Sequence, residues 1–120
     1  MGLDTTHGAW HGAYSAFMSW RIEICKTAGY GNLRDYEGFD GTNSFAAVTD
    51  KGLRLLLNHS DRDGHFTATQ CKKVADSLTT LLPKLNGHYG GHIGDIKEKT
   101  NTFINGCLLA YSKKQKLIFL

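Results

Sequence analysis

Proline, valine and cysteine are scarce in this chain, and none of its apolar stretches is long. The 120 residues include one Pro, three Cys and two Val, against 14 Leu. So few β-branched residues disfavour an extensive sheet and favour helices. No window approaches the roughly 18 apolar residues that cross a bilayer, and the start lacks a basic region followed by an apolar run. We therefore expect a cytoplasmic protein with no membrane segment and no export signal.

An excess of charge of one sign is also missing. Fourteen basic and 11 acidic residues give a formal net charge of +3. Because nucleic-acid binding usually needs clustered Lys and Arg, we expect no DNA or RNA partner, whereas a small anionic ligand fits this balance. Cys25, Cys71 and Cys107 are odd in number and far apart, within apolar helical patterns. They predict buried, reduced thiols rather than a disulfide framework or a zinc ribbon.

The spacing of apolar residues predicts one mainly α domain over residues 1–120, a bundle of about four helices with long glycine-rich loops. Pro83 should bend or end the third helix, which Thr67 or Thr69 can cap. The tail Leu117–Leu120 is expected to be extended. The expected helices are 6–27, 45–58, 67–85 and one from Asp95 to the basic run at 113–116, with loops at 30–44 and 86–94.

The segment HSDRDGHFTATQ, residues 59–70, resembles the calcium loop of an EF-hand. Asp61 and Asp63 stand at its third and fifth positions, and Gly64 stands at the sharp turn. His59 and Gln70 depart from the pattern, because calcium prefers an oxygen ligand at the first position and a bidentate carboxylate at the twelfth. The loop therefore predicts a weak divalent-cation site with Asp61, Asp63 and His59 as ligands.

Two other interpretations of this loop remain open. In one, His59, His65 and the two Asp side chains bind a transition metal or line a ligand pocket. In the other, the Asp carboxylates only accept backbone N–H bonds in a tight turn between two helices. Hydrolysis by a metal-bound water would also need a general base and further ligands.

A second group of candidate residues lies near the start, in HGAWHGAYSAFMSWR, residues 7–21. On a helix, His7, His11 and Tyr14 share a face that continues to Arg21, while Trp10 faces the core. The small residues between them would let a flat ligand approach closely. The alternative is that Trp10 and Tyr14 are ordinary core aromatics and the two His are partly exposed.

A third group, His88, Tyr89 and His92, lies in the glycine-rich segment NGHYGGHIG, which is flexible enough to close over a ligand. Aromatic rings can stack on a base, and His and Arg can bind phosphates. We therefore predict a non-enzymatic protein that binds a small, nucleotide-like anion. The candidate contacts are His7, Trp10, His11, Tyr14, Arg21, His59, Asp61, His88, Tyr89 and His92.

The segments GLDTTHGAWHGAYSAF, LLNHSDRDG and KTNTFINGC together resemble a family of small uncharacterised proteins found in bacteria and their phages. The resemblance implies no established activity. For a phage protein, capture of a nucleotide signal in the host cytoplasm would suit an anti-defence sponge, by analogy only. The alternatives are a divalent-cation module at 59–70, a metal-dependent enzyme, and an interaction protein without a small ligand. A homo-oligomer with sites between subunits would fit a sponge.

Overall fold

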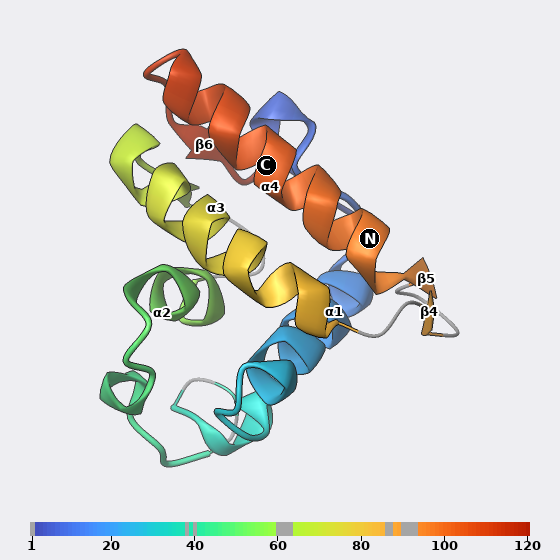
Figure 1. Cartoon of the computed structure of the whole chain (residues 1–120), viewed down its shortest axis with the longest axis vertical. Helices are drawn as coiled ribbons and strands as arrows, with labels where there is room; N and C mark the ends of the chain where they lie inside the picture. Colours follow the sequence, from blue (N-terminus) through green and yellow to red (C-terminus); the bar gives the residue numbers. More distant parts are fainter. Residues whose placement is uncertain (1, 38, 40, 60–63, 86–87, 90–93) are drawn as a thin grey trace.

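The computed structural model describes residues 2–37, 39, 41–59, 64–85, 88–89 and 94–120, and its shape is set by four α-helices (Figure 1). Helices α3 and α4 lie side by side and antiparallel, and α2 packs on α3. The mainly α fold expected from the sequence is confirmed. The helices are α1 (Tyr14–Thr27), α2 (Lys51–Leu57), α3 (Ala68–Leu81) and α4 (Ile96–Ser112).

Short elements connect these helices. Each strand pairs antiparallel with one other, as β1–β2, β3–β6 and β4–β5. The strands are β1 (Gly2–Asp4), β2 (His11–Ala13), β3 (His65–Phe66), β4 (His88–Tyr89), β5 (Gly94–Asp95) and β6 (Leu117–Ile118). The 3-10 turns are η1 (Thr6–Gly8), η2 (Leu33–Asp35), η3 (Phe45–Ala47) and η4 (Leu82–Lys84).

The caps expected for the two long helices are confirmed. Thr67 begins α3 with a capping box, in which its side chain accepts from the backbone N–H of Gln70 and the Gln70 side chain accepts from the Thr67 N–H. Asp95 begins α4 by accepting from two backbone N–H groups of the first turn. Pro83 lies in η4, directly after α3. Side-chain acceptors thus fix where both long helices start.

The first helix starts later than the spacing predicts. Residues 6–13 form η1 and β2, and α1 begins only at Tyr14. His7 and Gly8 have φ values of 63° and 67°, which a right-handed helix does not allow, and Asp4 pairs with His11 across the β1–β2 hairpin. The prediction that His7, His11 and Tyr14 share one helix face is therefore wrong.

The second helix is also shorter than predicted. Residues 45–58 divide into η3 and α2, because Asp50 caps a new helix by accepting from the Leu53 N–H at 3.1 Å. Gly52 lies in α2 against α3, where an added Cβ would overlap the carbonyl oxygen of Lys73 and the hydroxyl of Ser77. The glycine that weakens the helical pattern thus lets two helices meet at close range.

The core is aromatic around α1. Trp20 lies fully buried with its ring centroid 4.9 Å from that of Phe103, and its indole N–H donates to Thr100 at 2.9 Å. All three cysteines are buried and free of disulfides, as expected. Burial, with a smaller contribution from Asp35, raises the pKa of the Cys25 thiol to about 11. This thiol is therefore protonated at neutral pH.

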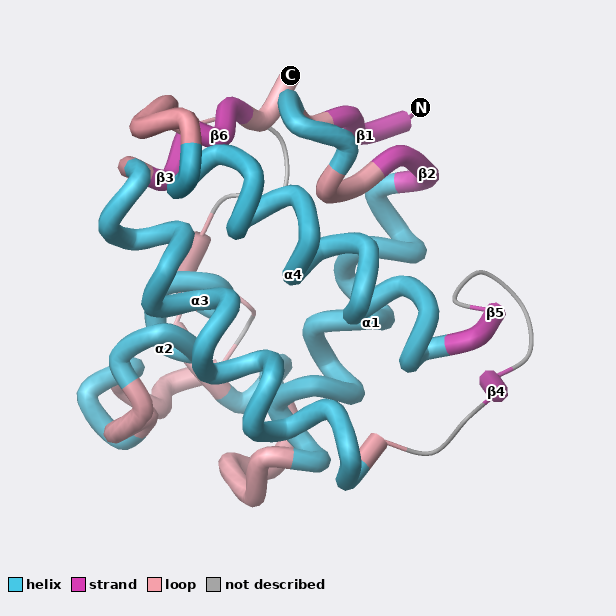
Figure 2. Tube along the Cα trace, turned by 45° about the horizontal axis from the view of Figure 1, so that its top comes forward, coloured by secondary structure: helices cyan, strands magenta, loops and turns pink. Residues whose placement is uncertain are grey.

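The C-terminal segment lies between two segments that are distant in sequence (Figure 2). On one side, Ile118 donates its N–H to the Thr6 hydroxyl at 2.9 Å, and Leu120 donates to the Asp4 carbonyl at 2.8 Å. On the other side, β6 pairs with β3, and Phe119 donates to the Gly64 carbonyl at 2.9 Å. The predicted extended tail therefore pairs with β3 on one side and is hydrogen-bonded to the N-terminal segment on the other.

Within the described part of the chain, none of the helices combines the length and the apolar character needed to cross a membrane.

Candidate functional site

An open hollow of about 210 Å³ lies between the end of α2 and the beginning of α3. We call it the Arg54 hollow. Its walls come from the second half of α2 and from the two ends of the 59–70 segment. The lining residues are Arg54, Leu55, Asn58, His59, His65, Phe66 and Gln70.

The last turn of α2 and its C-terminal cap residue form one wall of the hollow. Asn58 is the C-terminal cap residue of α2, and Arg54 lies one turn before it, so both side chains lie on the same side of the helix. On the opposite wall, the capping box fixes the Gln70 side chain, since its carbonyl oxygen accepts from the Thr67 N–H at 2.9 Å. The Gln70 amide nitrogen has no hydrogen bond to any described residue and can donate to a ligand.

His59 is held rigidly at the base of the hollow. Its ring centroid lies 4.6 Å from that of Phe66 and 4.3 Å from that of Phe119. The ring Nε2 lies 3.3 Å from the carbonyl oxygen of His65. Gly64 has a φ of +91°, and a Cβ there would lie only 3.2 Å from the His59 ring. Both the backbone angle and the close imidazole therefore favour glycine at this position.

Arg21 lies in the core and holds the backbone of one lining residue, His59. It is fully buried, and Nη1 donates to the carbonyl oxygens of Leu56, Leu57 and His59 at 3.3, 3.5 and 2.6 Å. Its guanidinium carbon also lies 4.7 Å from the centroid of the Phe17 ring. The last carbonyls of a helix attract cations, so Arg21 stabilises the end of α2 and positions His59. The sequence predicts that Arg21 contacts a phosphate, whereas in the structure its guanidinium donates to backbone carbonyls.

Among the described lining residues of the hollow, the guanidinium group is that of Arg54. Its Nε donates to the Val48 carbonyl at 2.9 Å, which holds the guanidinium in place, and its two terminal nitrogens have no hydrogen bond to a described residue. Two imidazoles and two side-chain amides complete the polar lining, and among the described lining residues there is no carboxylate. Guanidinium, imidazole and amide N–H groups are the donors that bind phosphates and carboxylates.

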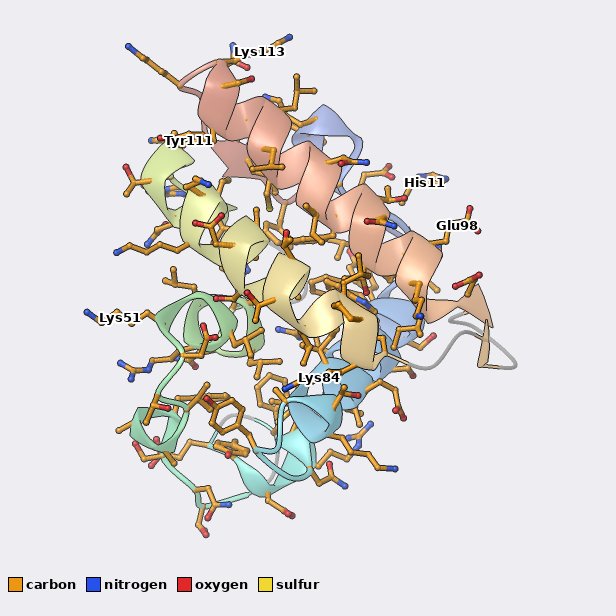
Figure 3. The ribbon with its side chains drawn as sticks, in the orientation of Figure 1. His11, Lys51, Lys84, Glu98, Tyr111 and Lys113 are labelled. Atoms are coloured by element: carbon orange, nitrogen blue, oxygen red, sulfur yellow. The ribbon has the colours of Figure 1, made fainter. Side chains whose placement is uncertain are left out.

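The structure does not bring the N-terminal candidates to this hollow. His7 contacts Thr6 and Gln115 through its two ring nitrogens, each at 2.8 Å. His11 is exposed and paired with Asp4. Figure 3 places His11 on the opposite side of the α3–α4 pair from Lys51 of α2. The N-terminal histidines thus form a separate surface.

The two aromatic candidates of this segment divide between core and edge. Trp10 is 2% exposed, with its ring 5.1 Å from that of Phe17, as the core-aromatic interpretation predicts. Tyr14 is half-buried at the start of α1. Neither lines the Arg54 hollow.

The remaining candidates are only partly covered by the structure. Asp61, Asp63 and His92 lie outside the described residues, and for His88 and Tyr89 the backbone alone is described, as β4. Among the described residues, no group of three or more His, Cys, Asp and Glu side chains is arranged to hold a metal. The cation site predicted for the 59–70 loop therefore stays a prediction.

Sequence reasoning missed Arg54 and Asn58. The available signal was their spacing of four residues, which places them on one side of any helix that ends just before His59. The predicted helix 45–58 contains both residues, but its apolar pattern does not show that the beginning of α3 lies beside them.

Comparisons with protein-family models, with curated proteins and with solved structures find no match to this chain.

Proposed function

We propose that this protein binds a small ligand through an anionic group, a phosphate or a carboxylate, in the Arg54 hollow. The observation that carries the proposal is the lining itself, in which a guanidinium, two imidazoles and two side-chain amides meet. An arginine held through Nε can still present its terminal nitrogens to two oxygens of one anion. We favour a nucleotide-like molecule as the ligand, and we propose that the protein sequesters it.

Rigidity of the lining supports binding. His59 packs against two aromatic rings, and Gln70 is fixed by the helix cap, so neither loses much side-chain freedom when a ligand binds. The volume of about 210 Å³ is smaller than the roughly 300 Å³ at which drug-sized pockets begin. The hollow thus suits a phosphate and the atoms next to it, with the rest of the ligand lying outside over Leu55.

A divalent cation is the second candidate, and one observation favours it. His59 and Gln70, the first and last residues of the EF-hand-like segment, both line the same hollow. A cation there would take Asp61 and Asp63 as its oxygen ligands, with His59 beside them. The two candidates differ in the charge of the ligand, so one experiment separates them.

The experiment is thermal unfolding of protein stripped with EDTA, repeated with inorganic phosphate, a nucleoside monophosphate, the uncharged nucleoside and calcium. Because a ligand that binds only the folded state stabilises it, a concentration of 100 Kd adds about 2.7 kcal/mol. We expect the monophosphate to raise the midpoint and the nucleoside to leave it unchanged. Arg54→Met should abolish the rise, whereas Arg34→Met, at an exposed arginine outside the hollow, should retain it.

Two results would contradict the proposal. Equal stabilisation of the wild type and Arg54→Met by the monophosphate would remove the role of the guanidinium. Stabilisation by calcium alone, lost in Asp61→Asn, would assign the site to a cation instead.

A further inference from the structure

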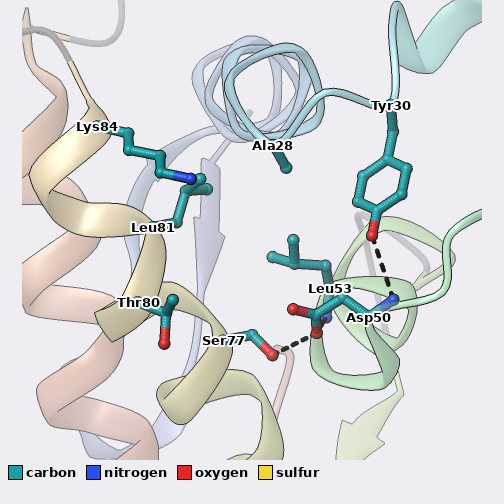
Figure 4. Close-up of a pocket in the computed structure, with 8 residues that line it drawn as sticks. All are labelled: Ala28, Tyr30, Asp50, Leu53, Ser77, Thr80, Leu81 and Lys84. Atoms are coloured by element: carbon teal, nitrogen blue, oxygen red, sulfur yellow. Dashed lines mark hydrogen bonds between the residues drawn. The ribbon is translucent and has the colours of Figure 1, made fainter.

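A second hollow, of about 130 Å³, lies at the opposite end of α2 (Figure 4). It opens between the beginning of α2, the second half of α3 and the residues that follow α1. Ala28, Leu53 and Leu81 supply its apolar surface, and Asp50, Ser77 and Lys84 are among its polar lining residues. We call it the Asp50 hollow. It shares no lining residue with the Arg54 hollow.

Asp50 is fixed with one carboxylate oxygen free for a ligand. Its Oδ1 accepts from the Leu53 N–H at 3.1 Å and from the Ser77 hydroxyl at 2.5 Å. Its own backbone N–H donates to the Tyr30 hydroxyl at 3.2 Å. The second oxygen has no hydrogen bond to a described residue, and in Figure 4 it is turned toward the hollow. Two hydrogen bonds to Oδ1 thus orient the carboxylate, a third holds its backbone, and the second oxygen remains an acceptor for a ligand.

Lys84 supplies the opposite charge from the other wall. Its side chain runs from η4 over Leu81 and ends in the hollow (Figure 4). The ion pairs among the described residues are His11 with Asp4 and Lys72 with Asp76, so Lys84 and Asp50 do not approach within the 4.0 Å of a salt bridge. A carboxylate and an ammonium group therefore face the same small space without neutralising each other.

We propose that the Asp50 hollow binds a small zwitterion of the α-amino acid class. The ammonium group of the ligand contacts the free oxygen of Asp50, and its carboxylate contacts Lys84. A short apolar side chain fits against Leu53 and Leu81. Complementary charges at both ends give specificity, because a ligand with only one charged group leaves the other protein charge without a partner. The volume of about 130 Å³ restricts the ligand to small members of this class.

The test measures binding of L-alanine by isothermal titration, with ethylamine and acetate as ligands that carry only one of the two charges. We expect alanine to bind at least tenfold more tightly than either. Asp50→Asn removes the charge but keeps a good helix cap and an acceptor for Ser77. Lys84→Met removes the ammonium group from an exposed side chain of similar length. Each variant should weaken alanine binding at least tenfold.

Matched controls separate this site from the Arg54 hollow. Lys51→Met removes a charge next to Asp50 that does not line the hollow, and it should bind alanine like the wild type. Arg34→Met, at an exposed arginine that lines neither hollow, should also leave alanine binding unchanged. The proposal is overturned if alanine binds no better than acetate, or if Asp50→Asn and Lys84→Met both bind it as the wild type does while their circular dichroism spectra show native folding.

Discussion

Trp10 buries a hydrogen-bond donor that the fold does not satisfy. Its indole N–H has no acceptor in the described structure, although the backbone N–H of the same residue donates to the Thr5 hydroxyl at 3.0 Å. The Lys99 ammonium lies 5.1 Å from the ring centroid and offers a cation rather than an acceptor. An unsatisfied buried donor costs about 1–3 kcal/mol, so an acceptor placed beside this indole should stabilise the protein.

Gly12→Ser should recover part of it. A Cβ at Gly12 would lie 3.5 Å from the Trp10 Nε1, an ordinary contact, and a serine hydroxyl there would reach hydrogen-bonding distance. We expect Gly12→Ser to be about 1 kcal/mol more stable than Gly12→Ala in urea unfolding. The alanine variant controls for the change in backbone freedom. Equal midpoints for the two variants would show that the serine does not reach the indole.

Single residues also show what the sequence revealed of the Arg54 hollow and what it did not. His59 was identifiable because it stands next to a sequence segment that contains two Asp and a Gly. Arg21 was identifiable as a candidate site residue. The orientation of its side chain was not, because its partners are the backbone carbonyls of residues 56, 57 and 59 at the end of α2. Local pattern gives residue types, whereas the partner of a long side chain is decided by packing between distant segments.

Helices α2 and α3 meet so closely that only glycine fits between them. An added Cβ at Gly52 would overlap both a carbonyl oxygen and the Ser77 hydroxyl. That same hydroxyl donates to Asp50, so the close approach also shapes the Asp50 hollow. The two hollows lie at the two ends of α2, and residues in or next to α2 and α3 line both of them.

Gly52→Ala should therefore destabilise the fold, although alanine is the better helix former. Overpacking of a tight contact costs about 1–3 kcal/mol, which exceeds the gain of about 1 kcal/mol in helix propensity. Urea unfolding should show a lower midpoint for Gly52→Ala than for wild type, and alanine binding in the Asp50 hollow should weaken. A stabilised Gly52→Ala variant would mean that α2 can move away from α3 at no cost.

The beginning of α1 shows why helix boundaries were harder to predict than helices. The apolar residues from Trp10 onward fit a helical period, yet Trp10 enters the core from a hairpin. Gly8 and Gly12 have poor helix propensity, and β1 provides a pairing partner that the apolar pattern does not register. By contrast, α3 and α4 carry strong caps within their own sequence, and there the predicted starts are confirmed.

Phe119 links three parts of the molecule. It is 3% exposed, its ring lies 5.9 Å from that of Phe17 in α1 and 4.3 Å from that of His59, and its backbone pairs with Thr5. Its neighbour Leu120 is 66% exposed. These adjacent apolar residues should therefore contribute very differently to the stability of the fold.

Phe119→Ala should lower the free energy of unfolding by about 3–5 kcal/mol, as expected for loss of a buried Phe. Leu120→Ala should change it by no more than about 0.5 kcal/mol. Denaturant unfolding of both variants tests the contrast. We also expect phosphate to stabilise Phe119→Ala less, since His59 loses one of the two rings that it packs against. Similar losses of unfolding free energy in the two variants would contradict the central role of Phe119.

The position of this strand also has a consequence for biosynthesis. Residues 4–6 and 64–66 leave the ribosome well before residues 117–120, which supply the backbone partners of both. Until then, Phe66 and the N-terminal segment lack the neighbour that covers them. The Arg54 hollow therefore takes its final form only after residues 117–120 have emerged, and a nascent chain should not acquire ligand affinity before that strand is free to insert.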